Sequence, residues 1–304
     1  MGRGHHSKRS RPNILISRMP TISGGALFDA VAIDVRTFFP NRSNFEIKVE
    51  YRGTNPSCRG VGANTRICLP PEFRTLEIST ADDLHFWLIV LGHEIAHYLN
   101  RHNDFNKGAQ ESALETKAIE DWADFFGTKL MMTIITFGPL INQFYKCYPE
   151  NNRYETRLES MANAFTKLAN GYYNIVSTRY STRTVRVGNC AAAICSFLDK
   201  LTGEMNVVRS FGVMRRIYFS PGLELIMQSE PMSFPEDIST IVEIHQTIQG
   251  VAPAITEGLR SDLERFIGTT FATTPEERDR YVATMRAEAV RQGVSLERLP
   301  AKGS

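Results

Sequence analysis

The chain has 304 residues, of which 42% are hydrophobic and 22% are charged, and its formal net charge at pH 7 is +2. This composition is ordinary for a globular protein and excludes an intrinsically disordered chain, and the length allows a core of one large domain or two. A net charge this small gives no electrostatic reason to expect nucleic acid or a membrane surface as a partner.

The N-terminal segment, residues 1–12, contains four basic side chains: Arg3, Lys8, Arg9 and Arg11. It has no apolar stretch of the kind that a secretory signal needs, and a solvated, disordered tail is favoured over a nucleic-acid-binding arm. The most apolar stretch, residues 130–141, is interrupted by Gly138 and Pro139 and is shorter than the ~20 apolar residues of a membrane span. Five cysteines without a C-x-x-C pair suit reduced thiols. We therefore expect a cytoplasmic protein without an integral membrane span.

In chain order, the first predicted element is a helix over residues 25–39, where apolar side chains recur at helical spacing. Alternation of apolar and polar residues at 45–51 predicts a strand. Residues 55–64 are rich in Gly, Pro and Asn and are expected to form a loop. Short strands are expected at 66–69 and 75–78, and the remainder of the chain is expected to be helical.

Two hydroxyl residues and two aspartates within residues 79–83 form a helix start signal, because a hydroxyl caps the first amides and the acids favour the positive end of the helix dipole. This helix should continue to about residue 100. A polar loop over 102–108 separates it from a second long helix over 111–136. Further helices are expected over residues 150–176, 188–203, 205–217, 236–248, 251–268 and 275–292.

Residues 93–97 have the pattern H-E-x-x-H. His93 and His97 lie on the same face of a helix, so both imidazoles can bind one metal ion. Glu94 lies at the flank of that face, where its carboxylate can take a proton from a water molecule beside the metal. The apolar residues 86–91 indicate a buried helix, in which such polar groups would be costly without a metal. The alternative is a surface helix whose histidines bind nothing.

An open catalytic site needs a third protein ligand, and the best candidate on the next helix is Glu120. Asp124 lies on the same face and can accept a hydrogen bond from the ring nitrogen of a histidine ligand that faces away from the metal. Glu111, Glu115 and Asp121 are rival ligands, and Glu115 lies on roughly the opposite face from Glu120. For Asp124, a solvated helix charge is the alternative.

The two motifs, H-E-x-x-H at 93–97 and E-x-x-A-D-x-x-G at 120–127, resemble those of the gluzincin zinc peptidases, in particular the HtpX heat-shock proteases and the CAAX prenyl proteases. The resemblance covers residues 84–130. It implies that Glu94 is the general base, that Glu120 is the third zinc ligand, and that helices surround a short sheet. Since this chain lacks the membrane helices of those relatives, no prenylated or membrane-embedded substrate is implied. The phage-exclusion protease Lit is a looser comparison, by size and motif.

In the gluzincins that the chain resembles, a His, Tyr or Arg after the second helix stabilises the oxyanion. Residues 180–186 contain one tyrosine and two arginines at a suitable point. Tyr180 and Arg183 are the candidate catalytic donors, and the alternative is a surface loop with ordinary charges.

The other histidines are not expected to bind metal. His102 follows His97 by five positions, out of register for the same helix face, and is expected to end the helix. His85 is expected to cap or to pack, and the remaining histidines have no partner at metal-ligand spacing.

The expected fold is therefore α+β and predominantly α. A zincin-like catalytic domain with a short β-sheet is expected over residues 13–187 and a helical C-terminal region over 188–292. Residues 1–12 are expected to form the basic, disordered tail and residues 293–304 a flexible tail.

The expected function is zinc-dependent hydrolysis of peptide bonds in a cytosolic protein or peptide substrate. A short edge strand before the metal helix, residues 66–69 or 75–78, is expected to bind extended substrate by strand addition. One alternative is a dedicated regulatory or phage-defence switch protease with a single partner. Another is a non-enzymatic interaction protein with a structural zinc, although Glu94 argues against it because a structural site needs no base. The sequence does not indicate an oligomeric state.

Overall fold

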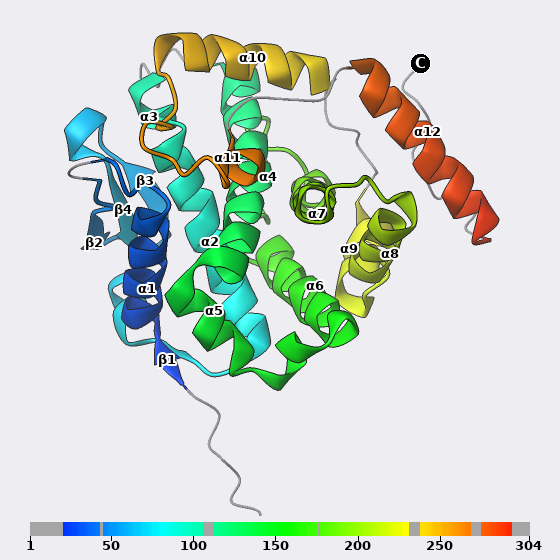
Figure 1. Cartoon of the computed structure of the whole chain (residues 1–304), viewed down its shortest axis with the longest axis horizontal. Helices are drawn as coiled ribbons and strands as arrows, with labels where there is room; N and C mark the ends of the chain where they lie inside the picture. Colours follow the sequence, from blue (N-terminus) through cyan, green and yellow to red (C-terminus); the bar gives the residue numbers. More distant parts are fainter. Residues whose placement is uncertain are drawn as a thin grey trace, which may run out of the picture.

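The computed structural model describes residues 21–42, 45–105, 112–175, 177–230, 238–268 and 275–293. Within them the expectation of a predominantly helical α+β fold is confirmed (Figure 1). In chain order, with η for a 3₁₀-helix, the elements are β1 (Ile22–Ser23), α1 (Gly24–Thr37), β2 (Val49–Tyr51), β3 (Ser57–Arg59), η1 (Gly62–Asn64), β4 (Arg66–Leu69), η2 (Pro71–Thr75), β5 (Glu77–Ile78), α2 (Ala81–Leu99), α3 (His102–Phe105), α4 (Ala113–Phe137), α5 (Pro139–Lys146), η3 (Pro149–Asn152), α6 (Tyr154–Asn170), α7 (Arg183–Thr202), α8 (Val207–Tyr218), α9 (Pro221–Ser229), α10 (Ile238–Val251), α11 (Glu264–Ile267) and α12 (Pro275–Arg291).

The described strands form two small sheets beside α1. In the three-stranded sheet β4 is central, with β2 parallel to it on one side and β3 antiparallel on the other. In the two-stranded sheet β5 pairs with β1. The prediction of a loop over 55–64 was wrong, because this segment contains β3 and η1. No side chain of β3 is buried, and the strand therefore lacks the alternation of apolar and polar residues that would have revealed it. The predicted strand over 45–51 is paired only at its last three residues.

Helix α2 begins where its capping residues predict, and α4, predicted from residue 111, begins at Ala113. The Thr80 hydroxyl accepts a hydrogen bond from the amide of Asp83 at 3.1 Å and starts α2. Ser112 and Glu115 form a capping box at the start of α4, each side chain bonding the other's amide. The Glu115 side chain is therefore engaged at the N-terminal end of α4. Glu111 lies outside the described residues.

The two long helices cross at a pair of glycines. A Cβ atom added to Gly92 of α2 would clash with the carbonyl oxygen of Gly127 of α4, and one added to Gly127 would lie 2.6 Å from the amide nitrogen of His93. Only glycine at both positions permits this approach. Because the crossing lies next to His93, it brings the H-E-x-x-H face of α2 against α4.

We expect Gly127→Ala to lower the free energy of unfolding by about 1–3 kcal/mol, because the added methyl group forces the two backbones apart. Gly212→Ala is the matched control: Gly212 lies in α8 with no atom within 4 Å of an added Cβ. It should raise the free energy of unfolding by about 0.5–1 kcal/mol, since alanine is the better helix former. Urea denaturation of both variants measures the difference. Equal effects of the two substitutions would contradict the close crossing.

The C-terminal half differs from the prediction in its boundaries. Helix α7 begins at Arg183, capped by Thr182, so the expected domain boundary between residues 187 and 188 falls inside this helix. Helices α5 and α9 were not predicted; each begins with a proline, which suits the first position of a helix. Of the helix predicted over 251–268, only α11 and the last residue of α10 are helical.

The non-helical segment between α10 and α11 is held by other helices. The amide of Ile255 bonds the carbonyl of Leu99 at 2.7 Å, and the amide of Arg260 bonds the carbonyl of Phe38 at 2.9 Å. These contacts use carbonyls at the ends of α2 and α1, which have no partner within their own helices. The segment therefore covers helix ends instead of continuing as a helix.

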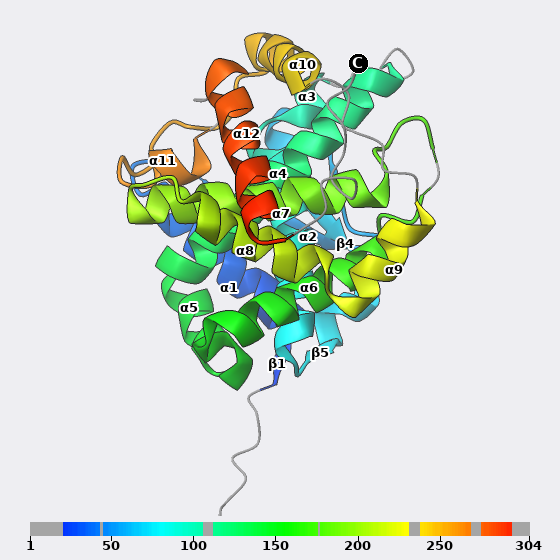
Figure 2. The same cartoon turned by 90° about the vertical axis from the view of Figure 1, so that its right-hand side faces the viewer.

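One hydrophobic core extends through these elements. It includes Leu27 of α1, Ile67 of β4, Leu91 of α2, Phe126 of α4 and Phe197 of α7. Helix α12 runs along the outside of α8 (Figure 2). In the part of the chain that the structure describes, no helix combines the length and apolarity needed to cross a membrane. The predicted tail over 1–12 lies outside the described residues, as does all of the predicted tail over 293–304 except Gly293.

Candidate metal centre

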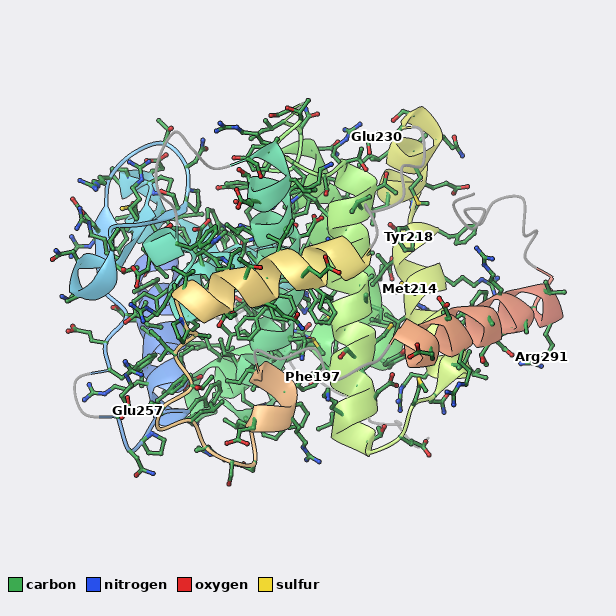
Figure 3. All side chains as sticks on the ribbon, turned by 90° about the horizontal axis from the view of Figure 1, so that it is seen from above. Phe197, Met214, Tyr218, Glu230, Glu257 and Arg291 are labelled. Carbon is green, nitrogen blue, oxygen red and sulfur yellow. The ribbon has the colours of Figure 1, made fainter. Side chains whose placement is uncertain are left out.

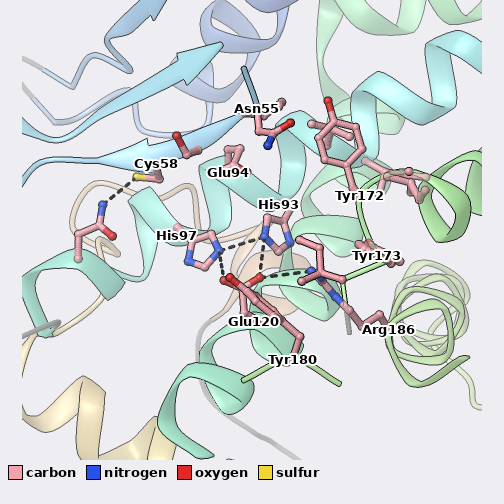
Figure 4. A pocket seen from close by; sticks show the side chains of 18 residues that line it. Asn55, Cys58, His93, Glu94, His97, Glu120, Tyr172, Tyr173, Tyr180 and Arg186 are labelled. Atoms are coloured by element: carbon pink, nitrogen blue, oxygen red, sulfur yellow. Dashed lines mark hydrogen bonds and ion pairs between the residues drawn. The ribbon is translucent and has the colours of Figure 1, made fainter. Parts of the chain in front are cut away.

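The three predicted metal ligands lie together between α2 and α4 (Figure 4). The Nε2 atoms of His93 and His97 are 3.0 Å apart. Glu120 places Oε2 at 3.5 Å from His93 Nε2 and Oε1 at 3.7 Å from His97 Nε2. Among the described residues this is the one group of His, Cys, Asp or Glu with ligand atoms close enough to hold a metal ion. Two histidines and a glutamate match the ligand set of catalytic zinc sites, so the residues present fit such an ion.

The predicted partner of His93 is also in place. Asp124 Oδ1 lies 2.8 Å from His93 Nδ1, on the side of the ring opposite the metal-facing nitrogen. Asp124 is buried and also accepts hydrogen bonds from the Tyr173 hydroxyl at 3.0 Å and from Arg186 Nε at 2.6 Å. These hydrogen bonds hold the Asp124 carboxylate in one position, and Asp124 therefore fixes the orientation of the His93 ring.

Arg186 joins this carboxylate to the predicted metal ligand. Its Nη2 donates to Asp124 Oδ1 at 3.0 Å and to Glu120 Oε2 at 3.3 Å, and its guanidinium lies 4.0 Å from the ring centre of Tyr173. Burial alone would raise the pKa of the Glu120 carboxyl, but the neighbouring imidazoles and the guanidinium hold that pKa below its usual value. This lowered pKa favours the ionised carboxylate, which is the form that can bind a metal ion.

The second arginine of the predicted donor segment lies elsewhere. Arg183 Nε bonds Glu230 Oε1 at 2.5 Å, and Glu230 also accepts from the amide and hydroxyl of Thr184. Arg183 is not part of the cavity wall at the candidate metal centre, whereas Tyr180 and Arg186 are. Because α7 begins at Arg183, the two arginines point to different neighbours, Arg183 to the end of α9 and Arg186 to α4. The segment predicted from the sequence thus reaches the cavity through Tyr180 and Arg186 and not through Arg183, and no signal in the sequence distinguished the two arginines.

A cavity of about 730 Å³ lies over the predicted ligands. Glu94 lines it, is 7% exposed, and receives a hydrogen bond from the backbone of Cys58 on β3. Burial raises the pKa of the Glu94 carboxyl to about 7. Glu94 is therefore held on the β3 side of the cavity, separate from the group of three ligands.

The strand at the cavity is not one of the two that the sequence indicated. Residues 66–69 form the central strand β4, and residues 77–78 pair with β1. The edge strand at the cavity is β3, and its Ser57 and Cys58 line the cavity together with the preceding Asn55 and Pro56. Strand β3 lies within the Gly/Pro/Asn-rich segment, so the sequence carried no pattern that revealed it.

Two other histidines are buried near these helices. His85 bonds the hydroxyls of Ser160 and Tyr145, each at 2.9 Å, so the expectation of a packed histidine is confirmed. His102 does not merely follow the helix: its Nδ1 lies 2.9 Å from Nδ1 of His97, and it begins α3 in place of the predicted loop. The rest of that loop, residues 106–108, lies outside the described residues.

Protein-family profiles, curated proteins and solved structures give no match to this chain. The resemblance to the gluzincins therefore rests on residues 93–97 and 120–127. What the structure adds to these motifs is their geometry: a His-His-Glu group able to hold a metal ion, beneath a cavity that also contains a buried glutamate.

Proposed function

We propose that the protein is a zinc-dependent peptidase with a zincin-like core, in which His93, His97 and Glu120 bind the metal. The observation that supports this most directly is a ligand group with three members at the wall of a cavity. Structural zinc sites have four protein ligands, whereas catalytic ones have three and keep a position for substrate. A buried glutamate beside the group, Glu94, has no function in a purely structural site.

A zinc ion held by His93, His97 and Glu120 would supply Lewis-acid chemistry, which polarises a carbonyl group and lowers the pKa of a water molecule. Glu94 takes the proton of the attacking water and passes it to the leaving amine. Asp124 and Arg186 keep the His93 ring and the Glu120 carboxylate in place throughout. Tyr180, whose side chain lines the same cavity, is the donor that we assign to the developing oxyanion.

The substrate in this proposal is an extended stretch of a protein or peptide. Strand β3 is an edge strand that lines the cavity beside Glu94, and an extended chain can pair with it by strand addition. The cavity is also lined by apolar and aromatic side chains that suit a hydrophobic substrate side chain: Ile89, Val90, Leu168 and Tyr172.

We place this activity in the cytoplasm. All five cysteines are free thiols, three of them buried. Free thiols in this number are typical of a reducing compartment and unusual in secreted proteins, where disulfides form.

The metal assignment predicts about one zinc ion per purified chain, which His93→Ala and Glu120→Gln should lose because two ligands no longer make a site. Glu115→Gln is the matched control, since this glutamate on the same helix bonds the amide of Ser112. It should keep full zinc content, as measured by plasma mass spectrometry after dialysis. Full zinc in both the His93 and the Glu120 variants would overturn the assignment.

A further inference from the structure

The second histidine of the motif has a buried partner that the mechanism above does not use. His102 is 2% exposed, and its Nδ1 lies 2.9 Å from Nδ1 of His97. The other nitrogen of His97, Nε2, faces His93 and Glu120. Each nitrogen of the His97 ring thus has its own neighbour: the predicted metal position on one side and a second imidazole on the other.

The chain adopts an unusual backbone conformation to place His102 there. Helix α2 ends at Leu99, and Arg101 follows with a φ of 54°, the one positive φ at a non-glycine among the described residues. This left-handed conformation is unfavourable for a residue with a Cβ atom, and it turns the chain back toward the last turn of the helix. The Arg101 side chain is held by Asp104 at 2.6 Å. The contact between Arg101 and Asp104 therefore stabilises the turn that places His102 against His97.

The surroundings of His102 are fixed as well. Asn100 accepts a hydrogen bond from the Trp122 indole nitrogen at 3.0 Å, which ties the end of α2 to α4. The ring of His245, on α10, lies 4.0 Å from the Trp122 ring and 6.1 Å from the His102 ring, centre to centre. Helix α10 crosses over α4 at this point (Figure 3). His102 is thus buried beside the end of α2 and the ring of His245 on α10.

Two imidazole nitrogens 2.9 Å apart share one proton, so one must donate and the other accept. If His97 binds a metal through Nε2, its proton resides on Nδ1. We propose that His102 is a positioning residue whose Nδ1 accepts a hydrogen bond from the Nδ1–H of His97 and so fixes the tautomer and the rotation of the His97 ring. His102 then does for His97 what Asp124 does for His93, with a neutral acceptor instead of a charged one. This inference rests on the proposed metal site.

Two substitutions of similar shape separate an acceptor from a packing contact. Asparagine and leucine both branch at Cγ, but only asparagine has an oxygen, Oδ1, close to the place of the imidazole Nδ1. His102→Leu should weaken zinc binding by about 10- to 100-fold, as the loss of a partner of a metal ligand does. His102→Asn should recover most of that affinity. The thermal midpoints of the two metal-free variants should not follow the order of their zinc affinities, because stability that comes from packing does not depend on a hydrogen-bond acceptor.

The measurement is zinc affinity by competition with a chromophoric chelator at fixed pH, together with the ¹⁵N NMR shifts of the histidine rings in zinc-loaded wild type. The shifts should show a protonated Nδ1 in His97 and an unprotonated Nδ1 in His102, and this readout does not depend on whether a variant folds. Equal affinity in wild type and His102→Leu, equal losses in both variants, or a protonated Nδ1 in His102 would overturn the inference while leaving the peptidase proposal intact. A wild-type protein that binds no zinc would overturn both.

Discussion

Glu94→Gln should lower peptide hydrolysis by about 10²- to 10⁴-fold, the usual value of a positioned general base. Zinc content and thermal midpoint should stay close to those of the wild type. Glutamine keeps the shape of the side chain and can still accept the hydrogen bond from the backbone of Cys58. Since Glu94 does not belong to the His-His-Glu group that could hold a metal ion, its replacement should remove the proposed proton transfer and leave that group complete.

The cleavage assay uses a panel of unstructured peptides together with proteomic identification of new N-termini on expression of wild type and of Glu94→Gln. Glu115→Gln serves as the active control. A general peptidase cuts many peptides, whereas a dedicated switch protease cuts almost none of them and generates new N-termini in one partner. Loss of zinc or of folding in Glu94→Gln would make this residue structural. Cleavage at the wild-type rate with zinc and fold intact would mean that the proposed mechanism is wrong.

Arg186→Met should lower the free energy of unfolding by about 3–5 kcal/mol, because removing one partner of a buried ion pair leaves a buried charge uncompensated. Arg186 is 5% exposed and donates to the fully buried Asp124 through two nitrogens. Methionine keeps much of the length of the side chain but donates nothing. We expect zinc affinity to fall with stability, since Arg186 also bonds the predicted ligand Glu120.

Arg183→Met is the matched control, one turn earlier on the same helix. Its partner Glu230 and its own side chain are 18% and 19% exposed, and such partly solvated pairs contribute about 1 kcal/mol or less. Chemical denaturation of both variants in the presence of a chelator measures the difference without any contribution from metal. A loss as large for Arg183→Met as for Arg186→Met would contradict the assignment of Arg186 as the buried arginine of the site. Loss of hydrolysis in a stable Arg183→Met variant would restore Arg183 as a catalytic candidate.

The sequence by itself determined those features of the site that depend on residues close together in the chain, namely where a helix begins and which residues share one of its faces. A threonine cap and two aspartates start α2 where predicted, and helical periodicity places His93 and His97 on one face. The same periodicity places Glu120 and Asp124 on one face of α4. The structure confirms that Glu120 lies beside His93 and His97 and that Asp124 bonds His93. Each of these signals acts within about one helical turn, so no knowledge of the rest of the fold is needed.

Only the tertiary structure decided which distant residues complete the site. Strand β3 exists because its backbone pairs with β4, and its side chains give no pattern that predicts it. Arg186 reaches Asp124 because α7 begins five residues before the predicted start and packs against α4. His102 meets His97 because one residue, Arg101, adopts a left-handed conformation. The first two contacts depend on how whole elements pack, and the third depends on one backbone angle. Neither the packing nor the angle produces a periodic pattern in the sequence, so neither could be predicted from it.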